Sequence, residues 1–278
     1  MLDLKYADVC LTMRIEIQPS ASFELTYHSF DIVGDTFTVP TGRGASDVFA
    51  DGVLSLLKDA EGNHCSSFPA ALLVVMQTAT KLFLPKHLEV DPQPALAGVR
   101  QDLLDLLATA KSFDPLTWAT ELQARSPARD LLHRTDIAAA HRAAVCIYIS
   151  RVLMSLHPGI HSTCNLEVLA AQIMDHLSSI CPTDSLFAAT AWPAFIAGAE
   201  THDLTRQELV ATRFRHLWEV EPWGLIREAS TLLKRIWASR SSRSMEVDLN
   251  RQPSPLALRA GGDWLEMLRG EGVDWLVM

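Results

Sequence analysis

The sequence has no two cysteines close enough together to form a compact metal site. No Cys-x2-Cys pair occurs anywhere in the 278 residues. An odd and dispersed set is typical of reduced, mostly buried thiols in a reducing compartment. A zinc cluster built from closely spaced cysteines is therefore not encoded in this chain. The five cysteines are Cys10, Cys65, Cys146, Cys164 and Cys181.

Positive charge is also in short supply. The chain has 24 Lys and Arg residues against 33 Asp and Glu residues, which gives a formal net charge of −9. Binding to nucleic acid depends on clustered Lys and Arg that neutralise phosphates. We therefore predict no DNA-binding residue here and no direct contact with nucleic acid. Any DNA binding would have to come from elsewhere.

Long apolar runs are missing as well. The longest uninterrupted run, Ala70–Met76, is far shorter than the about 20 residues that cross a bilayer. The start, MLDLKYAD, lacks a basic segment followed by an apolar one, so it does not resemble a secretory signal. We expect an intracellular protein without membrane contact.

The sequence lacks the common catalytic motifs, including Gly-rich phosphate loops, Gly-x-Ser-x-Gly and His-Glu-x-x-His. His157, His161 and Cys164 have metal-ligand chemistry, but Pro158-Gly159 places them in a turn and no fourth ligand is apparent. Structural zinc sites need a closed set of four. We predict no catalytic residue, no metal site and no cofactor, although missing motifs do not by themselves exclude an enzyme.

Two further groups of polar residues have side chains capable of chemistry. Asp102 and Asp105 could suggest the acidic helix of a terpenoid-type enzyme, but they fall on the polar face of an ordinary helix. His133, Asp136 and His141 lie near the start of one helix, where an acidic residue favours the helix dipole. Neither group requires a chemical role.

Residues 1–44 differ from the rest of the chain because their apolar residues alternate. Leu11–Gln18 and Phe23–Tyr27 alternate apolar and polar positions around a Pro19-Ser20 turn, and Thr36–Val39 is a third candidate strand. We predict a small β-hairpin or a linker in this segment.

From Ala45 onward the apolar residues recur at helical spacing, and Pro85–Pro94 is predicted to be a loop. The expected fold is an all-α, multi-helix layered bundle over residues 45–278, with a small β element at the N-terminus. The helices are predicted at Val48–Leu57, Phe68–Phe83, Leu96–Lys111, Thr135–Leu156 and Leu166–Ile180.

Residues 191–237 contain the densest set of helix signals. Pro193 fits the first turn of a helix, and Thr205 with Glu208 has the spacing of a capping box. Apolar residues then repeat at helical steps up to Trp237. Because Trp buries a large area, the tryptophans here are predicted to be core anchors.

Residues 238–255 are rich in Ser and Arg and poor in large apolar groups. Such a segment cannot offset its ordering entropy by burial, so we predict a mobile loop. Ser242 and Ser244 follow Arg240 and Arg243, which makes them candidate phosphorylation sites.

Residues 191–237 resemble the C-terminal hallmark of the fungal-specific transcription factor domain, a helical regulatory domain of fungal binuclear zinc-cluster regulators. In that family a Trp-Pro helix with a small-residue run precedes an Arg, a helix ending near Leu-Trp, a further Trp and a last long helix. The matching residues are Trp192, Pro193, Phe195, Gly198, Arg206, Leu217, Trp218, Trp223 and Trp237.

The resemblance implies a regulatory and interaction domain in the nucleus, without the zinc-cluster part. It also implies transcription-machinery partners or a homodimer, and a small-molecule effector bound between helices. The alternative is a standalone enzyme or small-molecule-binding protein in the cytoplasm that reuses the same helical fold. The sequence leaves both open.

Overall fold

The helical spacing of the sequence is realised throughout the part of the chain that the structure describes. The computed structural model describes residues 53–62, 67–83, 92–127, 130–157, 164–249 and 264–270, and within them no strand occurs. The predicted all-α class is confirmed, whereas the predicted N-terminal hairpin and the boundary at residue 44 lie outside these residues. The elements are α3 (Val53–Ala60), α4 (Ala70–Phe83), α5 (Pro92–Ser112), α6 (Pro115–Gln123), α7 (Leu131–Leu156), α8 (Leu166–Ser178), the 3₁₀ helix η1 (Ala188–Thr190), α9 (Ala191–Glu200), α10 (Leu204–Val220), α11 (Gly224–Leu249) and α13 (Trp264–Gly270).

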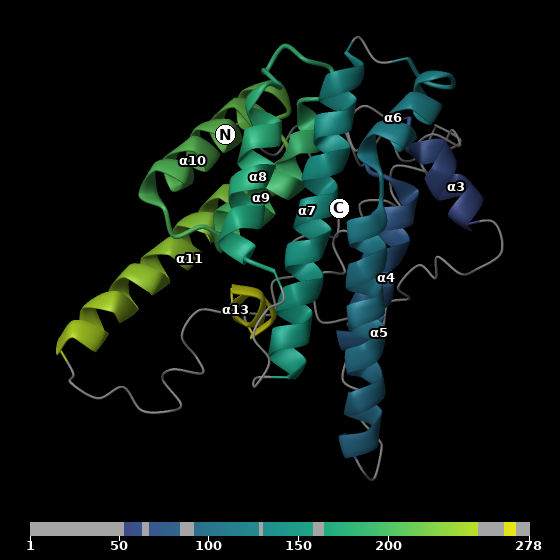
Figure 1. Cartoon of the computed structure of the whole chain (residues 1–278). Helices are drawn as coiled ribbons and strands as arrows, with labels where there is room; N and C mark the ends of the chain where they lie inside the picture. Colours follow the sequence, from purple (N-terminus) through teal and green to yellow (C-terminus); the bar gives the residue numbers. More distant parts are fainter. Residues whose placement is uncertain are drawn as a thin grey trace, which may run out of the picture.

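Helix α7 runs through the centre of the bundle (Figure 1). It contacts α4, α5 and α6 on one side and α8 and α9 on the other. Runs of alanine, such as 138–140 and 143–144, let neighbouring helices approach it closely. Among the described helices, only α7 is long and apolar enough to cross a bilayer, but 83% of that window is buried by the rest of the protein. Helix α7 is therefore a core helix of the bundle.

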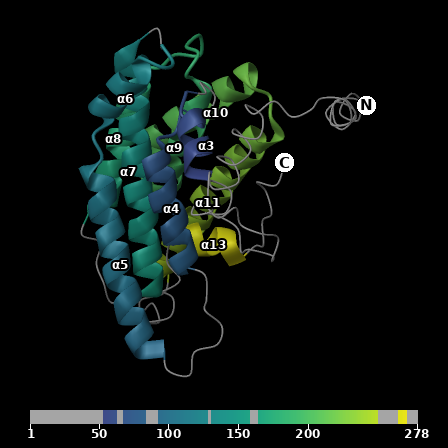
Figure 2. The ribbon, with the colours of Figure 1, turned by 90° about the vertical axis from the view of Figure 1, so that its right-hand side faces the viewer.

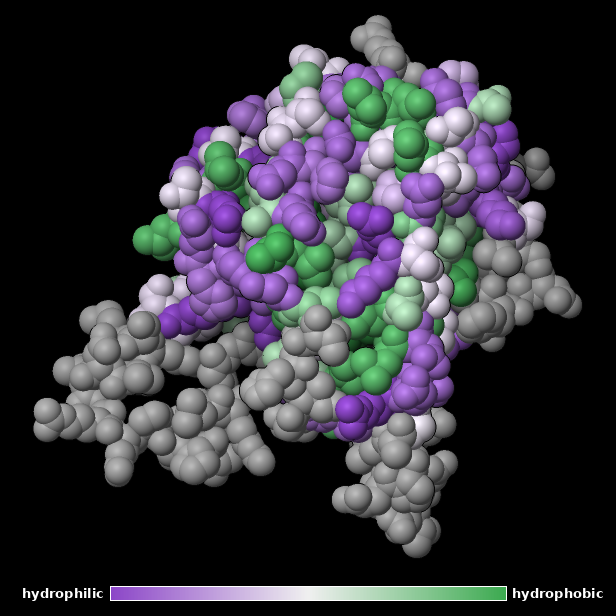
Figure 3. Space-filling view, viewed as in Figure 1, coloured by the Kyte–Doolittle hydropathy of each residue, from purple (hydrophilic) through white to green (hydrophobic). Residues whose placement is uncertain are grey.

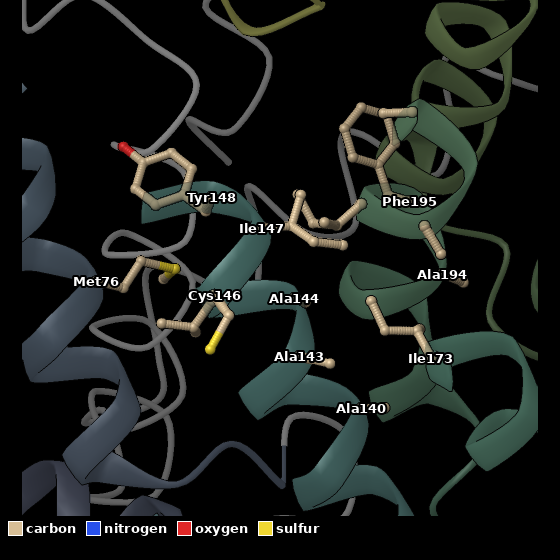
Figure 4. Close-up of a cluster of buried hydrophobic side chains, with 14 of the residues drawn as sticks. Met76, Ala140, Ala143, Ala144, Cys146, Ile147, Tyr148, Ile173, Ala194 and Phe195 are labelled. Carbon is tan, nitrogen blue, oxygen red and sulfur yellow. The ribbon is translucent and has the colours of Figure 1, made fainter. Parts of the chain in front are cut away.

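The core continues across the layers on both sides of α7 (Figure 4). Met76 from α4, Ile147 from α7, Ile173 from α8 and Phe195 from α9 are all buried in it. On the α4 side, the Tyr148 and Thr80 hydroxyls lie 2.9 Å apart and form a buried hydrogen bond. Polar residues interspersed with small apolar patches cover the face seen in Figure 3.

Side-chain caps begin several of the helices. Asp114, Asp130 and Asn165 accept a backbone N–H at the first turns of α6, α7 and α8. Asp203 caps α10 by accepting the N–H groups of Thr205 and Arg206 at 2.8 and 3.1 Å. The backbone hydrogen bond from Arg206 lowers the pKa of Asp203. The predicted capping box at Thr205 is therefore wrong, because the helix begins at Leu204.

Helix α5 begins inside the predicted Pro85–Pro94 loop. Its first residue is Pro92, and Pro94 also lies in its first turn. Proline is tolerated there because the first N–H groups of a helix have no partner within it. The loop prediction is wrong for residues 92–94.

Helix α11 corrects the prediction of a mobile loop over residues 238–255. It continues to Leu249, so residues 238–249 are helical, and only 250–255 lie outside the described residues. Arg240 anchors the extension by donating to the Ala199 and Thr201 carbonyls of another helix end. Composition alone missed this anchor because it depends on a tertiary partner.

Candidate functional site

Helix α9 lies at the junction of the second half of the fold. It contacts α7, α8, α10 and α11, and every residue from Pro193 to Glu200 is buried. A helix that is apolar on all sides is stable only when other elements surround it. The hallmark Trp-Pro pair occupies its first turn, because the helix begins at Ala191.

Gly198 is the point of closest approach on α9. A Cβ atom at this position would lie 2.7 Å from Val210 Cγ1 of α10 and 3.1 Å from Leu233 Cδ2 of α11. The absence of a side chain therefore lets α10 and α11 pack directly against the α9 backbone. This explains the small-residue run that the sequence shows here.

Side chains from α11 donate hydrogen bonds to the backbone carbonyls at the C-terminal end of α9. Trp237 Nε1 donates to the Gly198 carbonyl at 2.8 Å, and Arg240 donates to the Ala199 and Thr201 carbonyls. The last carbonyls of a helix have no partner within it and carry its negative dipole end. A cationic guanidinium at this position supplies both hydrogen bonds and favourable charge.

Glu200 forms a buried ion pair beside the same helix end. Arg151 Nε donates to Glu200 Oε2 at 2.9 Å, and Arg151 Nη2 donates to Oε1. Trp264 Nε1 of α13 donates to Oε2 at 3.0 Å. Both charged side chains are largely buried, at 12% and 5% exposure. A buried carboxylate needs this many donors to offset its lost hydration.

The hallmark Arg206 ties α10 to α8. Its Nη1 donates to Glu167 Oε1 at 3.1 Å, and the Thr201 hydroxyl donates to the same oxygen at 2.8 Å. Both side chains of the ion pair are about a third exposed, at 34% and 38%. The contact therefore fixes orientation more than it adds stability.

A second buried cluster is aromatic. The Trp192 ring stacks on His141 with a centroid distance of 5.9 Å, and Phe68 lies 4.1 Å from His141. His141 Nδ1 donates to the Ile137 carbonyl at 2.9 Å, since a carbonyl only accepts. Burial lowers the pKa of His141 to about 4, so the ring is neutral near pH 7. The Trp192 indole N–H is buried and has no acceptor within the described part of the chain.

Two hallmark tryptophans lie at the surface. Trp218 is 37% exposed and Trp223 is 40% exposed, at the end of α10 and just before α11. The guanidinium of Arg227 lies 5.6 Å from the Trp218 ring centroid. The prediction that the tryptophans are core anchors is therefore wrong for Trp218 and Trp223. Phe195 and Leu217 are fully buried, while Trp192 and Trp237 are partly buried against the core.

The polar candidates are placed in separate structural pairs. His133 Nδ1 lies 2.6 Å from Asp184 Oδ2, and His176 Nδ1 lies 2.9 Å from Asp136 Oδ1. His141 lies in the aromatic cluster instead. No group of three or more His, Cys, Asp or Glu side chains that could hold a metal ion occurs among the described residues.

The remaining candidates include exposed acids and residues outside the description. Asp102 and Asp105 are exposed on α5, and Asp105 accepts from Gln101. His157 is partly buried and Cys164 lies two residues before α8, but His161 lies outside the described residues. These positions do not form one site within the described structure.

The cysteines show different environments. Burial raises the pKa of the Cys146 thiol to about 11, which makes it a poor nucleophile. Cys181 is exposed, contrary to the expectation of mostly buried thiols, while Cys164 is partly buried. Cys10 and Cys65 lie outside the described residues.

The candidate phosphorylation sites lie on α11. Ser242 is exposed, and its hydroxyl donates to the Ala238 carbonyl at 3.0 Å. Ser244 belongs to the same helix. Both serines therefore lie in a helix and not in the predicted mobile loop, and modification of either serine stays a prediction.

Sequence reasoning missed the residues that organise the end of α9. Glu200, Arg151 and Arg240 belong to α9, α7 and α11, and each finds its partners more than 35 positions away. One local signal was present: Glu200 ends the apolar run AWPAFIAGA, where a charge is expected only with a partner.

Comparison with known proteins matches this architecture to one family. Residues 63–278 match the fungal-specific transcription factor domain. The acriflavine sensitivity control protein acr-2 of Neurospora crassa is 30% identical over 264 residues, which cover 91% of this chain and 41% of that protein. The chain thus spans about two fifths of this relative's length. No solved structure matches. The chain belongs to the fungal-specific transcription factor domain family, the regulatory domain of fungal transcription regulators.

Proposed function

We propose that this regulatory domain acts in the nucleus as the interaction module of a longer transcription regulator. The family match over residues 63–278 carries the proposal. A net charge of −9 disfavours phosphate binding by this chain, and its relative is more than twice as long. DNA contacts are assigned to a part of the protein outside these 278 residues.

The surface around the turn between α10 and α11 is the proposed contact for a protein of the transcription machinery. Trp218, Val220 and Trp223 are 37%, 42% and 40% exposed, and Arg227 lies over Trp218. Exposed Trp and Arg dominate the binding energy of many protein interfaces. Phe195 and Leu217 of the same hallmark are buried, whereas more than a third of Trp218 and of Trp223 is exposed.

The test fuses residues 1–278 to an unrelated DNA-binding domain and measures reporter transcription. Trp218→Ala with Trp223→Ala should change reporter output several-fold while leaving Tm nearly unchanged. Leu204→Ala, at a 77% exposed apolar residue at the other end of α10, is the matched control. Unchanged output from the double variant would refute this surface. Light scattering on the purified chain separates a homodimer contact from a contact with another protein.

We also propose that a small-molecule effector is sensed at the aromatic cluster of Phe68, His141 and Trp192. The buried Trp192 N–H has no acceptor among the described residues, so an effector oxygen placed there would gain a hydrogen bond. Trp192→Phe keeps an aromatic ring and removes this donor. The variant should lose effector response with little loss of basal output. An unaltered response would contradict this assignment.

A further inference from the structure

Helix α13 packs against α7, α9 and α11 near the lower end of the bundle (Figures 1 and 2). Trp264 packs edge-on against Phe195 of α9 at 6.5 Å, and Glu266 accepts from Ser155 of α7 at 2.7 Å. Met267 lies against Ser239 of α11, with 4.0 Å between sulfur and hydroxyl. We call this surface of α7, α9 and α11 the α13 groove.

The apolar side chains of α13 are buried as completely as core residues. Trp264 is 1% exposed, and Leu265 and Leu268 are both 0% exposed. Only seven residues form this helix, so it depends on the groove for its structure. A short helix with Trp and Leu anchors in an apolar groove is a common mode of peptide recognition.

The groove keeps its main polar contact without α13. Glu200 accepts from Trp264, but it also holds two hydrogen bonds from Arg151. Removing α13 therefore does not leave the Glu200 carboxylate without a partner. The α13 groove can receive another ligand with an indole N–H and the same apolar anchors.

The sequence contains a second copy of the segment that fills this groove. Asp-Trp-Leu-Glu-Met occupies positions 263–267, and Asp-Trp-Leu-Val-Met occupies positions 274–278. Four of the five residues are identical, and the one that differs is Glu266, which is exposed in α13. The Trp and Leu that are buried in the first copy are repeated in the second. We call the two copies the first and second Trp-Leu motifs.

We propose that the second Trp-Leu motif, Asp274–Met278, is an alternative occupant of the α13 groove and competes with the first motif within the same chain. The second motif would place the Trp275 indole beside Phe195 and Glu200. Val277 takes the place of Glu266 and cannot accept from the Ser155 hydroxyl. The second motif therefore lacks a hydrogen bond that the first motif makes, which weakens its binding by about fivefold, so the first motif occupies the groove at rest.

The test uses full-length variants and two labelled peptides, residues 263–270 and 271–278, with binding followed by fluorescence anisotropy. In Trp264→Ala/Trp275→Ala both motifs are disabled, so both peptides should bind and each should displace the other. In Trp264→Ala alone, the intact second motif fills the groove in cis. Because a tethered ligand has a millimolar effective concentration, this variant should bind either peptide at least about tenfold more weakly.

Three outcomes would overturn the proposal. The 271–278 peptide could fail to bind the folded double variant, the peptides could fail to compete, or the single and double variants could bind equally. A 271–278 peptide carrying Trp275→Ala is the matched control and should not bind. If circular dichroism shows that the double variant is unfolded, a wild-type chain with a specific protease site inserted after Pro255 replaces it. After cleavage, excess 271–278 peptide should displace the C-terminal fragment on gel filtration, and retention of the fragment would refute the proposal.

Discussion

Replacing Gly198 by Ala tests the packing of α9 most directly. The new Cβ would lie 2.7 Å from Val210 Cγ1 and 3.1 Å from Leu233 Cδ2. A Cβ contact under 3.0 Å is not tolerated, so either the Val210 side chain or a helix has to shift. Val210 and Leu233 are 0% and 1% exposed, so a shift of either side chain would displace other core atoms. The Trp237 hydrogen bond to the Gly198 carbonyl would also be stretched.

Two opposing terms decide the sign of the effect. Ala is favoured over Gly in a helix by about 1 kcal/mol. Overpacking a core usually costs about 1–3 kcal/mol, and the close Val210 contact places this site toward the upper part of that range. We expect Gly198→Ala to lower the free energy of unfolding by about 1–2 kcal/mol. Gly198→Leu should be more damaging.

Gly98 provides a matched control in α5. A Cβ at Gly98 would have nothing within 4 Å, so Gly98→Ala should gain the propensity term alone and stabilise the protein by up to about 1 kcal/mol. Urea unfolding followed by circular dichroism measures both variants. Stabilisation by Gly198→Ala of the same size as that by Gly98→Ala would refute the close approach. In a double-mutant cycle, Val210→Ala should reduce the cost of Gly198→Ala.

Three further predictions concern the buried clusters. Burial lowers the pKa of His141 to about 4. Between about pH 6.5 and pH 4 the unfolded chain therefore binds a proton that the folded chain does not, so the free energy of unfolding decreases as the pH is lowered. The stability advantage of the wild type over His141→Asn should thus shrink by about 3 kcal/mol between pH 7 and pH 4, and a constant difference would contradict burial of a neutral ring. Arg151→Ala should cost about 3–5 kcal/mol in urea unfolding because it leaves the Glu200 charge buried, and adding Glu200→Gln should recover part of that loss. Phe195→Ala should cost about 3–5 kcal/mol, whereas Trp218→Ala should cost less than about 1 kcal/mol, and equal costs would contradict the different burial of the two rings.

Helix existence could be predicted from the sequence because each helix has its own local apolar period. The small-residue run around Gly198 is part of the family resemblance, and the structure places it at a close approach of helices. The family to which the chain belongs could be recognised from the order and spacing of the hallmark residues, and the family match confirms it. These features depend on neighbours in the sequence or on a linear pattern.

Features that depend on a distant partner could not be predicted. The composition of residues 238–249 predicts a loop. In the structure Arg240 donates to a carbonyl at the end of α9, and helix α11 continues to Leu249. Tryptophan is a residue type that usually packs in the core. Trp218 nevertheless lies on a side of α10 where it is partly exposed to solvent, beside Arg227. Asp203 and Thr205 are both good caps, and only the backbone start at Leu204 chooses between them.

Two of the hallmark residues, Gly198 and Trp237, follow from one physical requirement, the burial of a whole helix. Burying α9 on all sides removes water from its last carbonyls, so side chains from other helices have to replace that water. Trp237 and Arg240 do so from α11, and this fixes the position of α11 along α9. Gly198 then becomes necessary because Trp237 reaches its carbonyl only when the helices nearly touch. Trp218 and Trp223 have no part in this requirement, and the proposed contact with another protein rests on their exposure.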